Sequence, residues 1–178
     1  MADIENYSQG QIAQLLSTSG AFSGMPQALA LRVAEQMAMA AFEVGGTLTV
    51  EGRPNHGQLM LIVSGDVRIS SQLAGSTETL VYRTATAGHL IGEVGFVDGL
   101  PHSATATAVT PTHVAVLERS RFTHMLINEP QVAAQLMAGL LRILAERMRH
   151  SNMTLKALTL VHAGLQEELV NLRKLVNV

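Results

Sequence analysis

The hydrophobic residues near the start of the chain recur with the period of a helix. One such stretch lies within residues 1–20, and a second begins after Pro26 and repeats every four residues, at Leu29, Val33 and Met37. Proline suits the first turn of a helix because its missing N–H would have no intrahelical partner there. The pattern therefore predicts a helical arm over 1–20 and a second helix over about 27–40.

After Phe42 the hydrophobic period changes from that of a helix to two, and glycines recur at turn-like intervals. Such a segment is typical of short strands joined by turns. So many strands in about 75 residues favour a sandwich, a jelly roll or a small barrel. The expected strands are Thr47–Val50, Leu59–Val63, Val67–Ser71, Thr79–Thr84, His89–Ile91, Ser103–Val109 and Thr112–Leu117.

Near Arg119 the helical period returns and, apart from an interruption at Pro130, it continues to the C-terminus. Steps of three and four residues trace the a/d repeat of a coiled coil, which only Ser151 and His162 interrupt. The repeat predicts a parallel homodimer, although packing of the same face on the β-roll is the alternative, above all for residues 131–145. The repeat consists of Ala134, Met137, Leu141, Leu144, Met148, Ser151, Leu155, Leu158, His162, Leu165, Leu169, Leu172 and Val176.

These patterns predict an α+β, mainly β fold. We expect a jelly roll of about eight strands, preceded by an N-terminal helix and followed by a long C-terminal dimerisation helix. The expected divisions are a helical arm over 1–20, the roll with its flanking helices over 21–130 and the dimerisation helix over 131–178.

Composition narrows the classes of function. The 178 residues are 47% hydrophobic and 15% charged, which is typical of a globular chain with one core. A net charge of −2 disfavours a general attraction to nucleic acid or to anionic membranes. Without cysteine the chain has no disulfide and no thiolate chemistry. The polar, acidic start lacks the features of a signal peptide, so we expect a cytoplasmic protein without a membrane span.

Catalytic and metal-binding motifs are not apparent. The seven histidines are scattered without a ligand-pair spacing, and the chain contains neither a P-loop nor a nucleophile elbow. We therefore expect no bound metal, no catalytic residues and no enzymatic activity.

The glycine-rich segment from Gly88 to Thr105 is too long for a hairpin turn. A single helical turn at about 93–97 would present N–H groups to an anion, with donors from His102 and Ser103 nearby. This pattern suits a phosphate cradle, and taken alone it suits a structural turn equally well.

In its context, the segment resembles the phosphate-binding cassette of the catabolite activator protein family, and residues 20–160 as a whole resemble that family's cyclic-nucleotide-binding domain. The turn at 22–26, the strand and glycine spacing at 42–52 and 59–65, and the cassette carry the likeness. The resemblance implies a non-enzymatic sensing module whose ligand is a cyclic purine nucleotide, cAMP rather than cGMP, and whose output is read by an unidentified protein partner.

The resemblance also implies roles for single residues. Glu93 would accept a hydrogen bond from the ribose 2′-hydroxyl, backbone N–H groups at Gly92, Val94 and Ala104 would hold the cyclic phosphate, and Ser103 would add a hydroxyl. Three residues of the long helix would close over the purine, namely Arg147, Ser151 and Asn152.

One departure concerns the phosphate ligand itself. The family's signature arginine, ten residues after Gly92, is His102 here. Histidine carries less charge near neutral pH and donates from one nitrogen toward a given oxygen, whereas arginine grips two oxygens. Two interpretations stay open. Either protonated His102 binds the phosphate, or the pocket is degenerate and the fold is a ligand-free scaffold for protein–protein contacts. Arg83 on a neighbouring strand is a candidate source of the lost charge.

A second departure lies at the C-terminus. Transcription factors of this family continue into a helix-turn-helix domain, but residues 165–178 leave no room for a recognition helix. We therefore expect no DNA binding from this chain, with a truncated regulator as a further alternative.

Overall fold

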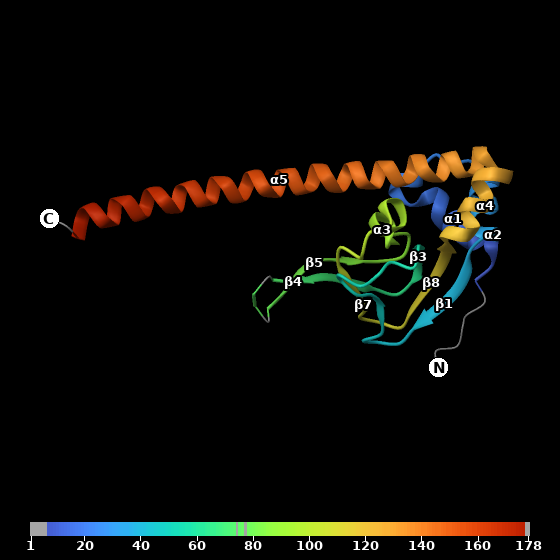
Figure 1. Cartoon of the computed structure of the whole chain (residues 1–178), viewed down its shortest axis with the longest axis horizontal. Coiled ribbons are helices and arrows are strands. Elements are labelled where there is room, and N and C mark those ends of the chain that lie inside the picture. The colour runs from blue at the N-terminus through green and yellow to red at the C-terminus, as the bar shows by residue number, and fades with distance from the viewer. Residues whose placement is uncertain (1–6, 74, 77, 177–178) are drawn as a thin grey trace. The chain divides into compact units, whose positions relative to one another are not determined.

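The computed structural model describes residues 7–73, 75–76 and 78–176, and its chain divides into two compact units, Met1–Leu140 and Leu141–Val178. The first unit contains two four-stranded sheets together with the helices that flank them (Figure 1). This arrangement confirms the predicted mainly β fold with an N-terminal helix and a long C-terminal helix. The division of the chain into an arm, a roll and a dimerisation helix stays a prediction.

The chain begins with helix α1 (Gln9–Thr18), which starts at a capping box. The Ser8 backbone N–H donates to Gln11 Oε1 at 2.8 Å, and the Gln11 N–H donates to Ser8 Oγ at 3.3 Å. Ile12 and Leu16 on the inner face are buried, so the weakly periodic stretch expected within 1–20 is a helix anchored in the core.

The second predicted helix is shorter than expected. A 3₁₀ turn η1 (Gly20–Phe22) leads to α2 (Gln27–Glu35), and residues 38–40 are not helical but open strand β1 (Ala38–Phe42). The prediction of a helix over 27–40 was wrong at its end because alanines extend the apolar pattern equally well in either structure. Pairing of this segment with a neighbouring strand decides its conformation.

The strands are divided between the two sheets in a jelly-roll order (Figure 1). One sheet has the order β1-β8-β3-β6 and the other β2-β7-β4-β5, and all the pairings between neighbouring strands are antiparallel. The bounds of the remaining strands are β2 (Thr47–Thr49), β3 (Gln58–Ser64), β4 (Val67–Gln72), β5 (Thr79–Ala85), β6 (Leu90–Ile91), β7 (Thr105–Ala108) and β8 (Thr112–Glu118).

Side chains from both sheets form one apolar core. Strand β3 is buried along five consecutive residues, whereas β4 and β7 contribute alternate small or branched residues. Small side chains let the sheets approach closely, which an aromatic-poor sequence needs for dense packing. The buried cluster consists of Leu48, Met60, Ile62, Val67, Ala85, Ile91, Ala106, Ala108 and Val114.

Two helices follow the roll, α4 (Arg119–Asn128) and α5 (Pro130–Val176). The part of α5 within the first unit is buried on a face that includes Val132, Leu136 and Leu140. The predicted a/d residue Ala134 is exposed. Up to residue 140 the helix therefore buries a different face from the coiled-coil repeat, so core packing does not account for that repeat.

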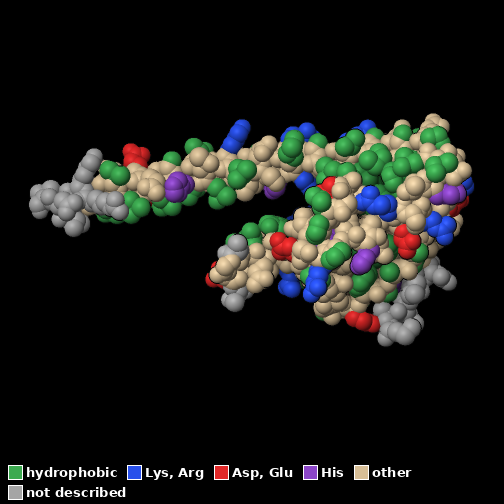
Figure 2. All heavy atoms as spheres, viewed as in Figure 1, with side chains coloured by type: hydrophobic (Ala, Val, Ile, Leu, Met, Phe, Trp, Pro, Cys, Tyr) green, Lys and Arg blue, Asp and Glu red, His purple; other side chains and the backbone are tan. Residues whose placement is uncertain are grey.

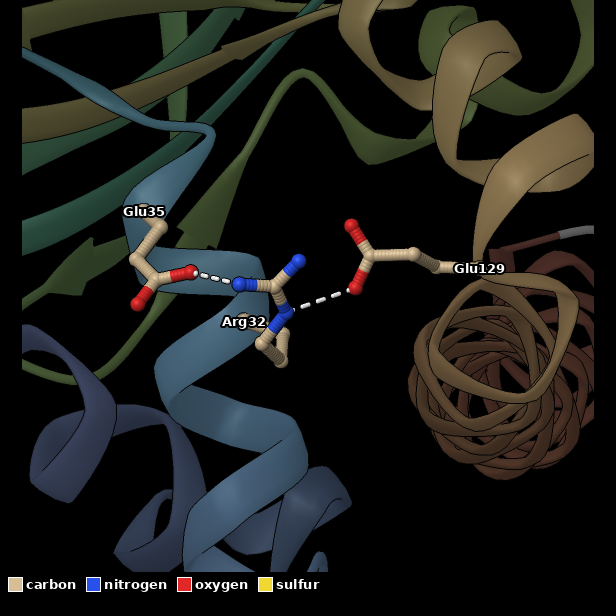
Figure 3. A network of polar contacts seen from close by, with 3 residues as sticks. All are labelled: Arg32, Glu35 and Glu129. Atoms are coloured by element: carbon tan, nitrogen blue, oxygen red, sulfur yellow. Dashed lines mark hydrogen bonds and ion pairs between the residues drawn. The ribbon is translucent and has the colours of Figure 1, made fainter.

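An ion-pair network joins α2 to the junction between α4 and α5 (Figure 3). Arg32 Nη1 lies 2.6 Å from Glu35 Oε2, and Arg32 Nε lies 2.7 Å from Glu129 Oε2. The hydrogen bond that Arg32 donates to Glu129, followed by the charges of both carboxylates, raises the pKa of Arg32. Solvent reaches the network, so it fixes the path of the chain into α5 more than it stabilises the fold.

Within residues 7–73, 75–76 and 78–176, the structure contains no helix long and apolar enough to span a bilayer.

Candidate functional site

The segment predicted to cradle a phosphate connects the two sheets. It leaves the first sheet at the end of β6, forms the short helix α3 (Glu93–Asp98) and enters the second sheet at the start of β7. The helical turn expected at about 93–97 is therefore present. Because each end of the segment is tied to a paired strand, its two halves are held by the rigid part of the roll.

Two glycines shape this segment through backbone conformations that side chains rarely adopt. Gly92, before α3, has φ of 81°, and a Cβ there would lie 2.7 Å from the Gln58 carbonyl oxygen. Gly99 ends the helix with φ of 74°. Between them, Glu93 is only 2% exposed although it is a carboxylate, which is costly outside a polar site.

Arg119 anchors α3 from the side opposite its N-terminus. Its Nη2 donates to the carbonyl oxygens of Gly95 at 3.0 Å and Phe96 at 2.6 Å, and its guanidinium lies 5.5 Å from the centre of the Phe96 ring. A cation near the C-terminal end of a helix also interacts favourably with the helix dipole. The sequence does not reveal this role, because a single arginine after a strand carries no pattern.

Asn55 is a second residue whose role the sequence does not reveal. Its Oδ1 accepts the Gly57 N–H at 2.8 Å, and its Nδ2 is buried without a hydrogen-bond partner among the described residues. A Cβ at Gly95 would collide with this amide, so α3 and the β2–β3 loop approach each other closely only because residue 95 is glycine.

The second half of the segment is held by its backbone. The His102 N–H donates to the Arg53 carbonyl at 3.1 Å, and the His102 carbonyl accepts the Gly52 N–H at 2.9 Å. Further along, the Ala104 carbonyl accepts the Thr49 hydroxyl at 3.2 Å. The position of residue 102 therefore does not depend on its side chain.

The His102 imidazole is half-buried. Burial, and then the nearby charge of His56, lower the pKa of His102 below its ordinary value of 6.5. Near neutral pH the imidazole is therefore mostly uncharged in the absence of an anion, and it supplies less of the positive charge that a phosphate needs.

The predicted site residues fall into two groups. Gly92, Glu93 and Val94 lie at the start of α3, and His102, Ser103 and Ala104 immediately precede β7, so one segment of the first unit carries all six. Ser103 is exposed to solvent, and Ala104 is half-buried.

The other group, Arg147, Ser151 and Asn152, lies on α5 in the second unit, where Ser151 and Asn152 are exposed. Their contact with a purine stays a prediction. The described residues include no cluster of three or more histidine, aspartate or glutamate side chains arranged to hold a metal ion.

Comparison with known proteins identifies the family of the domain that contains this segment. The family model for the cyclic nucleotide-binding domain matches residues 40–129, which is half of the chain and includes all of β2 to β8 and α3. The resemblance inferred from the sequence is thereby confirmed.

Curated relatives include a CRP-like cAMP-activated global transcriptional regulator of Mycobacterium tuberculosis, 27% identical over 139 residues, which are 78% of this chain and 59% of the regulator. A cyclic AMP receptor protein of Thermus thermophilus is 33% identical over 106 residues, 59% of this chain and 46% of that protein. This chain therefore spans less than two-thirds of the length of either relative.

Among solved structures, a cyclic nucleotide-binding domain from Methylobacillus flagellatus superimposes with a TM-score of 0.72 at 27% identity, over 80% of this chain and 79% of that one. Sequence and fold thus agree, and the chain belongs to the cyclic nucleotide-binding domain family.

Proposed function

We propose that this chain is a non-enzymatic sensing module that binds a cyclic purine nucleotide, cAMP in preference to cGMP, and signals to a protein partner in the cytoplasm. The observation that carries the proposal is the cassette: a nearly fully buried Glu93 follows Gly92 in a segment tied to both sheets, within a chain of this family. Glu93 would bind the ribose 2′-hydroxyl, while the N–H groups of Gly92, Val94 and Ala104 and the Ser103 hydroxyl would hold the phosphate.

The state of His102 gives this proposal a pH dependence. In the free protein the pKa of His102 is lowered, whereas a phosphate placed beside the imidazole would raise it. Binding would then take up a proton, so affinity increases as the pH falls into the range between the two pKa values.

Isothermal titration of cAMP at pH 6.0 and pH 8.0 tests the sensing function. We expect saturable binding at both values, with tighter binding at pH 6.0. No heat and no saturation at millimolar cAMP at either pH would instead support the alternative, a ligand-free scaffold that serves protein–protein contacts.

We further propose that α5 forms a parallel homodimer in the second unit. Most of its described a/d residues are exposed there, including Leu155 at 61%, Leu158 at 60% and Leu165 at 55%. Hydrophobic side chains are visible on the surface along this helix (Figure 2). A second copy of the same helix would bury this stripe. Such a dimer would let the ligand change the helix geometry that the partner reads.

Replacing Leu158 by aspartate should convert the dimer to a monomer, because the substitution places two facing carboxylates at a d layer. Leu160 is the matched control: it is 74% exposed, lies at the outer f position, and its replacement by aspartate should leave the dimer intact. Sedimentation equilibrium distinguishes the two results. A Leu158→Asp variant that keeps the wild-type mass would contradict the coiled-coil proposal.

A further inference from the structure

Arg83 lies on the inner face of the roll. On β5 it pairs with Ile69 of β4, while the neighbouring pair Ala85 and Val67 belongs to the buried core and Ile69 packs against that core. Directly opposed residues of antiparallel strands share one face of a sheet, so Arg83 occupies the core side. Thr84, the next residue along the strand, is exposed on the outer side.

This guanidinium differs from the anchored arginines of the first unit. Arg32 is paired with two carboxylates and Arg119 with two carbonyl oxygens. In the described part of the chain, Arg83 forms no ion pair with an acidic side chain and no hydrogen bond to a carbonyl group, although it is half-buried. Its burial lowers the pKa of Arg83, which indicates a cation that has lost water without gaining a counter-charge. An anion bound between the sheets would provide that counter-charge.

The strand register places Arg83 near the cassette. Arg83, Ile69 and Ala106 form one row across β5, β4 and β7, and Ala106 follows Ala104 by two residues. Neighbouring strands are about 4.8 Å apart, so the backbones of Arg83 and Ala106 are separated by about 10 Å, a distance that an arginine side chain and a bound nucleotide readily span. From the other side, β5 leads through a short turn into β6 and Gly92.

We propose that the Arg83 guanidinium binds the phosphate of the cyclic nucleotide and supplies the positive charge that His102 does not provide at neutral pH. The inference rests on the proposed sensing function. Arginine stays charged at every physiological pH and can grip two phosphate oxygens. Arg83 accordingly accounts for the part of the affinity that persists at pH 8.0, and His102 for the part that increases on acidification.

The test replaces Arg83 by methionine, which keeps the length and the apolar stem of the side chain. Removing a half-buried cation that has no protein partner should leave the thermal unfolding temperature equal or higher, while the affinity for cAMP at pH 8.0 falls by about tenfold or more. Arg68→Met is the matched control, because Arg68 is exposed on the outer face of β4, opposite Thr84. It removes the same charge and should leave the affinity unchanged.

Titration with cAMP and with neutral adenosine separates the outcomes. Loss of cAMP affinity in Arg83→Met, with adenosine binding as in the wild type, supports the phosphate role. Wild-type cAMP affinity in that variant, an equal loss for both ligands, or a lower unfolding temperature overturns it while the sensing function stands. If the wild-type protein itself does not bind cAMP, the sensing function fails, and the role of Arg83 fails with it.

Discussion

Replacing Gly139 by alanine should destabilise the first unit by about 2 kcal/mol, although the same change favours helix formation almost everywhere else. Gly139 lies in α5, and a Cβ built on it would overlap the Phe22 ring, which is 2% exposed and fixed in the core. The ring cannot retreat into solvent, so the helix and the N-terminal helices must separate. The free energy of unfolding, measured by urea titration with far-ultraviolet circular dichroism, should fall accordingly.

Gly164 in the same helix is the control. Apart from its chain neighbours and the backbone of its own helix, no atom lies within 4 Å of a Cβ built there, and the residue occupies an outer c position of the repeat. Gly164→Ala should therefore raise helix content and stabilise the helix by up to about 1 kcal/mol. A second variant that adds Phe22→Leu to Gly139→Ala should recover part of the lost stability, because the smaller side chain relieves the overlap. Equal stability of Gly139→Ala and the wild type would contradict the assigned contact.

Long-range packing explains what the sequence left unpredicted in this region. A glycine within a helical pattern indicates only a local cost, since the reason for it, Phe22, lies more than one hundred residues away. The end of α2 was mistaken for the same reason: Ala38–Phe42 has no strong period, and its pairing with β8 decides its structure. Local pattern predicts an element well only where the side chains on its two faces differ.

The cassette was predictable because its requirements are local. Gly92 and Gly99 take positive φ, and the residues between them form one helical turn, all of which a glycine spacing can reveal. The roles of Arg119 and Arg83 were harder to predict than the cassette. Arg119 acts through carbonyl groups of another element, and the inner position of Arg83 follows only from its register with Ile69.

Restoring arginine at position 102 should raise the affinity for cAMP at pH 8.0 by ten- to a hundredfold. The gain corresponds to one charge-assisted hydrogen-bonding group, worth about 1.5–3 kcal/mol. The backbone of residue 102 is fixed by hydrogen bonds to Arg53 and Gly52, so His102→Arg leaves the cassette in place. Partial burial also costs the guanidinium of arginine less free energy than it would cost the ammonium group of lysine, because the guanidinium is more weakly hydrated.

The pH profile gives an independent check of the same variant. Wild-type affinity should rise between pH 8.0 and pH 6.0 because His102, whose pKa is lowered in the free protein, gains a proton when the phosphate binds. An arginine is charged throughout this range, so the His102→Arg variant should show almost no dependence on pH. His124→Arg serves as the control, since it adds the same charge at an exposed residue of α4 that lies outside the cassette, and it should change the affinity by less than about threefold.

Combining His102→Arg with Arg83→Met shows whether the two cations share one phosphate. If they do, the loss caused by Arg83→Met should be smaller in the His102→Arg background than in the wild type, because the second guanidinium already neutralises the anion. Equal losses in both backgrounds would mean that the two residues act on separate parts of the ligand. A His102→Arg protein that still fails to bind millimolar cAMP would show that the pocket is closed, and the fold would then serve as a scaffold rather than a sensor.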